Sequence, residues 1–110
     1  MVEITRQTAV ALQLPEGGVA TVPLFLDSPH SGSLYPDDFN SLLPPLRLRR
    51  AEDAFVNELF GDAPQLGVPL IDAKFPRSYL DANRNELDFS PDDLADDWPG
   101  TLAPSEKGIK

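Results

Sequence analysis

Cysteine is absent from this 110-residue chain, and histidine occurs only once. Without cysteine the chain can form neither a disulfide framework nor a thiolate metal cage, so a reducing compartment, or one indifferent to redox, suits it. Basic residues are also scarce, because 9 Lys and Arg stand against 18 Asp and Glu and give a formal net charge of −9. A chain this acidic repels phosphate, so we expect neither nucleic acid nor an anionic membrane as a partner.

Long hydrophobic runs are missing as well. The longest apolar run near the start, Val22–Leu26, is shorter than the core of a secretory signal and far shorter than a membrane span of about 20 residues. We therefore expect a cytoplasmic protein. Its length predicts a single domain over residues 1–110, and its 12 prolines predict many stiff loops.

The residue pattern predicts three strands of an α/β fold. An edge strand is expected within residues 2–14, a buried strand over Val19–Leu26, and a further strand over Val68–Phe75. Beyond Asn85 the chain is acidic and contains proline, with few apolar residues, so we expect extended or irregular structure there.

Two helices are expected between the second and third strands. A short one begins after Pro36 and is closed by Pro44 and Pro45, and a longer one spans Leu48–Leu66, where apolar residues recur at helical spacing. The order strand, helix, strand predicts a crossover that leaves the polar loops after both strands at the same edge of the sheet. Ligands in open α/β sheets collect at such an edge.

The single histidine, His30, follows the buried strand and lies between Pro29 and the pair Ser31 and Gly32. A loop imidazole of this kind most often bonds a backbone carbonyl. A rigid proline before the ring and a permissive glycine after it can also hold the ring in one direction, as a metal ligand or a general base requires. Both interpretations stay open on the residues alone.

Two neighbouring acids lie near the start of the longer predicted helix. At 100° per residue Glu52 falls within the apolar stripe, and Asp53 falls on its border. A buried carboxylate needs a cation, a metal or hydrogen-bond donors, although both acids can equally complement the helix N-terminus beside Arg49 or Arg50. With His30, one of these acids would give two zinc ligands of suitable type, where a catalytic zinc usually has three.

The loop after the third strand carries a second polar group, made of Arg77, Asp81, Asn83 and Arg84. Two guanidinium groups can each bind a carboxylate through two hydrogen bonds, and an amide can both donate and accept. This combination suits an acidic small molecule. Pairing of Arg84 with Asp81, or with the acids that follow, is the alternative.

Four blocks of residues occur in a fixed order along the chain: Ser28–Gly32, Tyr35 with Pro36, Glu52–Phe60, and Phe75–Arg84. Together they resemble the N-formylglutamate amidohydrolase family, and the resemblance extends over nearly all of the chain. It implies an α/β fold in which a partial three-layer sheet with flanking helices forms the N-terminal part of a hydrolase like the zinc carboxypeptidases and deacylases.

The activity implied by this resemblance is zinc-dependent hydrolysis of N-formyl-L-glutamate, or of a related N-acyl amino acid, to formate and L-glutamate in histidine breakdown. A water activated by the metal would attack the formyl carbonyl. His30 resembles the first zinc ligand, and an acid near the start of the helix resembles the second. The family pattern favours Asp53 and the helix geometry favours Glu52, so both are expected as metal-ligating and catalytic candidates.

The resemblance also assigns substrate binding and positioning to Arg77, Asn83 and Arg84, and the orientation of an arginine to Asp81. Family members are longer and carry a second histidine ligand in a later block, which this sequence lacks. We therefore expect residues 1–110 to form a truncated N-terminal part that is inactive alone. A downstream segment is the expected source of the missing ligands.

Two other classes of function stay open. The chain can be a binding module that holds a carboxylate ligand at Arg77 and Arg84 without metal chemistry. It can also be an inactive fragment, with an unfinished core and an exposed sheet edge that favours aggregation.

Overall fold

The computed structural model describes residues 9–106. Three short strands form one sheet: β1 (Val10–Gln13), β2 (Leu26–Ser28) and β3 (Leu70–Ala73). Two short helices, α1 (Pro45–Leu48) and α2 (Val56–Leu59), lie between β2 and β3 in the sequence. Short 3₁₀ turns occupy Glu16–Gly18, Arg49–Ala51, Ala63–Leu66 and Pro91–Asp93. The predicted α/β class is confirmed for this small mixed sheet.

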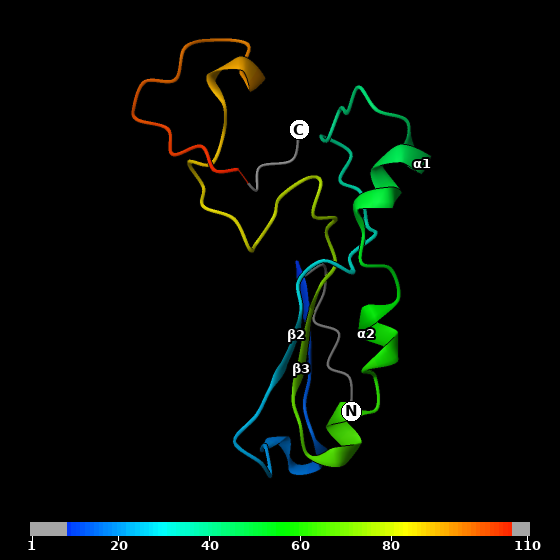
Figure 1. The fold of residues 1–110 in the computed structure, drawn as a ribbon. Helices are drawn as coiled ribbons and strands as arrows, with labels where there is room; N and C mark the ends of the chain where they lie inside the picture. The colour runs from blue at the N-terminus through cyan, green and yellow to red at the C-terminus, as the bar shows by residue number, and fades with distance from the viewer. Residues whose placement is uncertain (1–8, 107–110) are drawn as a thin grey trace.

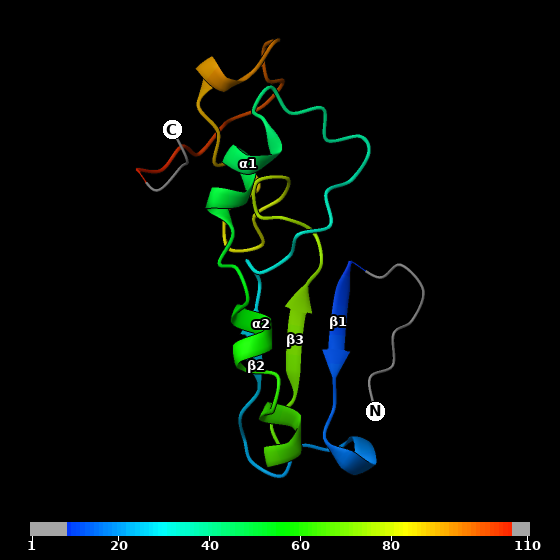
Figure 2. The same ribbon diagram turned by 90° about the vertical axis from the view of Figure 1, so that its right-hand side faces the viewer.

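The central strand of the sheet is β3, with β1 antiparallel on one side and β2 parallel on the other (Figure 2). Its residues Leu70, Asp72 and Ala73 are buried. The parallel register pairs Ser28 with Asp72, so β2 and β3 run toward the same edge. The prediction that the polar loops after these two strands share one edge is confirmed.

Helix α2 lies beside the sheet, and α1 lies beyond the end of the strands, on the side of the loops after β2 and β3 (Figure 1). Residues 9–106 therefore show a small mixed sheet with α2 packed beside it, which accounts for part of the expected partial three-layer sheet with flanking helices. In this part of the chain no helix is long and apolar enough to cross a bilayer.

The predicted helix over Leu48–Leu66 is wrong. The chain breaks it twice, because Glu52 is extended (φ −72°, ψ 140°) and Phe55 adopts a left-handed φ of 67°. Pro64 has no amide proton to donate. It lies in the first turn of the 3₁₀ segment Ala63–Leu66 and favours this segment over a continued α-helix. The apolar stripe consequently does not form, and Leu59 is 79% exposed.

The predicted strand over Val19–Leu26 is also wrong in its extent, since β2 begins only at Leu26. Pro23 has no amide proton for a strand ladder. The segment is attached to the fold through Thr21, whose amide donates to the carbonyl of Gly67 at 3.0 Å. Most apolar side chains of the segment that precedes β2 are exposed.

No helix forms between Pro36 and Pro44, contrary to the prediction. The described chain has a single turn there, in which the amide of Phe39 donates to the carbonyl of Pro36 at 3.1 Å. Pro45 begins α1 and does not close a helix, because proline suits the first turn. The expected edge strand within 2–14 is confirmed as β1, and residues 2–8 lie outside the described part.

Over residues 86–106 the expected irregular structure is confirmed, apart from the short turn Pro91–Asp93. The carboxylate of Asp88 accepts hydrogen bonds from the amide and the hydroxyl of Ser105, both at 2.6 Å. These bonds join the two ends of the segment and lower the pKa of Asp88 below its usual value.

Candidate functional site

His30 lies two residues after the end of β2 and is 8% exposed, so its ring is enclosed by the protein on most sides. Gly32 fixes this loop against the chain after β3. A Cβ atom at Gly32 would lie 2.7 Å from the carbonyl oxygen of Lys74 and nearer still to that of Phe75. Only glycine permits this approach, and the amide of Leu34 then donates to the carbonyl of Lys74 at 2.9 Å.

Both nitrogens of the His30 ring face carboxylates. Nε2 lies 2.7 Å from Oδ1 of Asp81, and Nδ1 lies 3.4 Å from Oδ2 of Asp53. The backbone adds a direct link, because the amide of Asp53 donates to the carbonyl of His30 at 2.9 Å. The loop after β2 therefore brings the histidine and one of the two predicted acids together.

Asp81 is the most highly bonded carboxylate of this group. Its Oδ2 accepts from Nη2 and Nε of Arg77 at 3.0 and 3.3 Å, and its Oδ1 accepts from the amide of Asn83 at 2.9 Å as well as from His30. Burial alone would raise the pKa of Asp81, but these hydrogen bonds together hold the pKa below its usual value. Asp81 is therefore ionised at neutral pH and can only accept, so Nε2 of His30 is the donor in their hydrogen bond.

Arg77 connects the two acids on either side of the histidine. Besides its bonds to Asp81, its Nη1 lies 3.8 Å from Oδ1 of Asp53. We call His30, Asp53, Arg77 and Asp81 the His30 cluster. Its members come from the chain after β2, the turn before α2 and the chain after β3.

Glu52 lies outside the His30 cluster. Its Oε2 accepts from Nε of Arg49 at 3.1 Å, and its side chain is 2% exposed. Of the partners expected for a buried Glu52, namely a cation, a metal or hydrogen-bond donors, the structure shows the Arg49 cation. The direction of its side chain was not predictable from helix geometry, because the backbone at Glu52 is extended and adjacent extended residues point to opposite sides.

Tyr35 lies against the buried side of Glu52. Burial, followed by the nearby Glu52 carboxylate, raises the pKa of the Tyr35 hydroxyl, and Ser78 lies close to the same hydroxyl. Oη of Tyr35, Oε1 of Glu52 and Oγ of Ser78 are all buried, and the Tyr35 hydroxyl interacts with the other two side chains.

Asn83 and Arg84 follow the cluster along the chain without joining it through their side chains. Nη1 of Arg84 donates to the carbonyl of Asn83 at 3.0 Å, and the amide of Arg84 donates to the carbonyl of Asp81 at 3.2 Å. Nε of Arg84 is buried and has no hydrogen-bond partner among the described residues. The guanidinium lies close enough to Asp88 to help lower the pKa of that carboxyl group.

Sequence reasoning missed two features of this edge. The contact between Asp81 and His30 joins residues 51 positions apart, and no local pattern signals it. Asp72 is completely buried at the register position beside Ser28, and its Oδ2 accepts from Nζ of Lys74 at 2.6 Å. The alternating pattern of β3 placed Asp72 in a strand, but nothing in the sequence marked it as buried.

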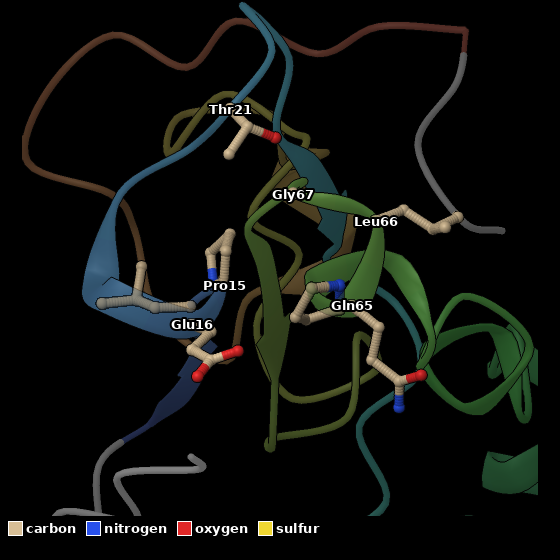
Figure 3. A pocket seen from close by; sticks show the side chains of 8 residues that line it. Pro15, Glu16, Thr21, Gln65, Leu66 and Gly67 are labelled. Atoms are coloured by element: carbon tan, nitrogen blue, oxygen red, sulfur yellow. The ribbon is translucent and has the colours of Figure 1, made fainter.

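A broad, open hollow of about 530 Å³ lies among residues that follow β1 and precede β3, including Pro15, Thr21 and Gly67 (Figure 3). The turns that line it lie at the end of the sheet opposite to the loops after β2 and β3 (Figure 1). It contains no member of the His30 cluster, so it is not part of the candidate site.

Part of the His30 cluster fits a zinc ion. Two ligand atoms bound to a tetrahedral zinc at about 2.1 Å are about 3.4 Å apart, and Nδ1 of His30 and Oδ2 of Asp53 are separated by 3.4 Å. Within residues 9–106 no group of three or more histidine, cysteine, aspartate or glutamate side chains is arranged to hold a metal. The fit therefore concerns two ligands of the three that a catalytic zinc usually has.

Residues 22–106 match the family described as N-formylglutamate amidohydrolase. The chain is also similar to a solved structure, the N-formylglutamate amidohydrolase from Ralstonia eutropha JMP134, with 47% sequence identity and a TM-score of 0.78. The match covers 87% of this chain and 35% of that chain, so this chain spans about a third of the relative's length. No curated protein matches the sequence.

Proposed function

Because the chain belongs to the N-formylglutamate amidohydrolase family, we propose that it forms part of a zinc-dependent site that hydrolyses N-formyl-L-glutamate, or a related N-acyl amino acid, to formate and L-glutamate. The observation that carries this proposal is the environment of His30, with Asp53 at one ring nitrogen and Asp81 at the other. In the complete protein, this sheet would belong to a three-layer fold with helices on both faces.

His30 and Asp53 are the residues that would hold the zinc, through Nδ1 and Oδ2. Asp81 accepts a hydrogen bond from Nε2–H of His30, which favours the tautomer in which Nδ1 can bind the metal through its lone pair. Zinc, when bound, supplies a Lewis acid that lowers the pKa of water and polarises a carbonyl group. Arg77 balances the charge of the two acids and keeps both beside the ring.

Arg84 is the better of the two arginines for binding a substrate carboxylate. Arg77 already donates two hydrogen bonds to Asp81, whereas Nε of Arg84 has no partner among residues 9–106. A substrate carboxylate would be bound by the terminal nitrogens of Arg84, and the side-chain amide of Asn83 next to it can donate or accept one further bond. Arg77 would then act mainly by positioning Asp53 and Asp81.

Catalysis requires at least one further zinc ligand, since residues 9–106 offer two. A downstream segment or a second polypeptide would supply it. The isolated chain should therefore release no formate from N-formyl-L-glutamate. Detectable turnover by the purified chain would contradict this part of the proposal.

The second candidate function is carboxylate binding without chemistry, and the unpartnered Nε of Arg84 favours it. It predicts that L-glutamate binds the chain with the same affinity before and after removal of zinc. Loss of binding on substitution Arg84→Lys would locate the ligand, because lysine cannot donate two parallel hydrogen bonds.

A chimera tests the main proposal. The part of the Ralstonia eutropha enzyme that matches this chain is replaced by residues 1–110, and formate release is measured. We expect activity, a loss of at least about 100-fold for His30→Ala and Asp53→Asn, and little change for Glu52→Gln. A well-folded chimera that hydrolyses the substrate equally well with His30→Ala would refute the assignment.

A further inference from the structure

Asp72 on β3 is a completely buried acid that lies outside the His30 cluster. Its Oδ2 accepts a hydrogen bond from Nζ of Lys74 at 2.6 Å and another from Nδ2 of Asn57 at 3.3 Å. A buried carboxylate is costly unless it is paired and hydrogen-bonded, and these two donors meet that requirement. Asp72 therefore joins the central strand to α2 through its side chain.

Helix α2 has little apolar burial to hold it beside the sheet. None of its residues, Val56–Leu59, is buried, and Leu59 is 79% exposed. Hydrophobic stabilisation scales with the apolar area removed from water, so packing alone restrains this helix weakly. The hydrogen bond from Asn57 to Asp72 is thus a specific anchor that fixes where α2 lies relative to β3.

The turn that carries Asp53 leads directly into α2. The amide of Val56 donates to the carbonyl of Asp53 at 3.4 Å, and the amide of Asp53 donates to the carbonyl of His30 at 2.9 Å. Asn57 is the next residue after Val56, so a hydrogen-bonded backbone connects it to Asp53. A displacement of α2 away from β3 would therefore pull Asp53 away from the histidine.

The chain after β3 holds the histidine side of the site through its backbone. Directly after the strand, the carbonyl of Lys74 accepts from the amide of Leu34, in the loop that carries His30, at 2.9 Å. The central strand is thus the common reference for His30 and for Asp53. On the side of Asp53, the attachment is made by the carboxylate of Asp72.

We propose that Asp72 is a positioning residue for the His30 cluster. Its carboxylate holds Asn57, and through the start of α2 it keeps Oδ2 of Asp53 at 3.4 Å from Nδ1 of His30. Lys74 balances the charge of the buried carboxylate. The effect on Asp53 rests on contacts within the protein, whereas an effect on zinc rests in addition on the proposed function.

An exchange of the side chains at positions 57 and 72 tests this role. Asn57→Asp places a second carboxylate against Asp72 and removes the hydrogen bond. Asn57→Asp combined with Asp72→Asn restores the bond with its direction reversed, because the amide at position 72 then donates to the carboxylate at position 57. Glu58→Gln changes an exposed acid of the same helix and is the matched control.

Two backbone amides separate a local effect from a global one. Hydrogen exchange at the amide of Asp53 reports whether its bond to the His30 carbonyl is formed. The amide of Lys74 donates to the carbonyl of Ala9 at 2.8 Å and reports on the sheet. The imidazole NMR signals of His30 add a second local readout, because the chain has no other histidine.

In the full chain without metal, we expect Asn57→Asp to speed exchange at Asp53 by about tenfold relative to Lys74. The ring signals of His30 should shift in the same variant. Glu58→Gln should change neither readout, and the double variant should return both toward the wild-type values.

Exchange that speeds up equally at Asp53 and Lys74 would overturn the positioning role, since the carboxylate would then act only through overall stability. Unchanged exchange at Asp53, or a double variant that resembles Asn57→Asp, would overturn it too. If Asn57→Asp does not fold, Asn57→Ala removes the hydrogen bond without adding a charge and gives the same comparison of the two amides.

A zinc titration separates this inference from the proposed function. We expect Asn57→Asp to weaken zinc binding by about tenfold, because the position of Asp53 beside His30 is disturbed. If the wild type itself binds no zinc, the proposed function fails, and the exchange experiment still decides the role of Asp72.

Discussion

Nε2 of His30 donates to Oδ1 of Asp81 at 2.7 Å, and this single bond joins the loop after β2 to the chain after β3. The same carboxylate accepts two bonds from Arg77. Asp81 thus fixes both the proton on the histidine and the position of the arginine.

Substitution Asp81→Asn should weaken both the fold and the metal site. The loss of hydrogen bonds between a buried carboxylate and charged donors should lower the free energy of unfolding by about 1.5–3 kcal/mol. Loss of the partner of a ligating histidine should weaken zinc binding by about 10–100-fold. Urea unfolding and a zinc titration measure the two effects.

Asp88→Asn is the matched control for that variant, since Asp88 is also hydrogen-bonded but lies outside the His30 cluster. It should destabilise the segment around Ser105 and leave the affinity for zinc unchanged. An equal loss of zinc affinity in both variants would show that Asp81 acts only through overall stability.

Substitution Gly32→Ala should strongly destabilise the chain. The new Cβ would overlap the carbonyl oxygens of Lys74 and Phe75, and backbone atoms cannot move aside without disturbing β3. We expect a loss of about 2–3 kcal/mol in urea unfolding. Gly100→Ala is the control and should change stability by less than about 0.5 kcal/mol, because its Cβ meets only ordinary contacts with Trp98.

The strands near the site were partly predictable, because the strand expected over Val68–Phe75 contains β3 (Leu70–Ala73). The helix over Leu48–Leu66 was not, since its apolar spacing is helical while its backbone is broken at Glu52 and Phe55. The hydrogen bond from the Asp53 amide to the His30 carbonyl is part of that broken backbone. It is a contact between distant residues, which periodicity does not register.

The same break decides which acid meets His30. Helix geometry placed Glu52 inside the apolar stripe and Asp53 at its border. In the extended backbone the two side chains separate, so that Asp53 faces His30 while Glu52 pairs with Arg49. Residue types therefore identified the candidates, and only the tertiary structure distinguished between them.

Stability should fall in acid as Asp81 becomes protonated. The pKa of Asp81 is lower in the folded chain than its usual value near 3.9, so the unfolded chain binds the proton more readily. Its contribution is therefore fully present above about pH 5 and is lost as the pH falls through the lowered folded pKa. Urea unfolding between pH 7 and pH 3 should show a steeper loss for the wild type than for Asp81→Asn.

Substitution Phe55→Gly should be neutral or stabilising. Phe55 holds a left-handed φ of 67° and is 62% exposed, so it carries backbone strain with little burial in return. Relief of that strain should offset the extra chain entropy of glycine and change the free energy of unfolding by about 0 to +1 kcal/mol. Phe60→Gly, at a φ of −97°, should instead destabilise. A large loss of stability in Phe55→Gly would show that the ring makes contacts that matter more than the strain.

Zinc stoichiometry tests the central claim, that His30 and Asp53 form half of a zinc site. The full chain is dialysed against buffered free zinc and measured by elemental analysis, beside His30→Ala, Asp53→Asn and Glu52→Gln. The geometry predicts about one saturable zinc per chain in the wild type and in Glu52→Gln, and none in the other two variants. Equal zinc in the wild type and His30→Ala, or loss of zinc in Glu52→Gln with retention in Asp53→Asn, would contradict it.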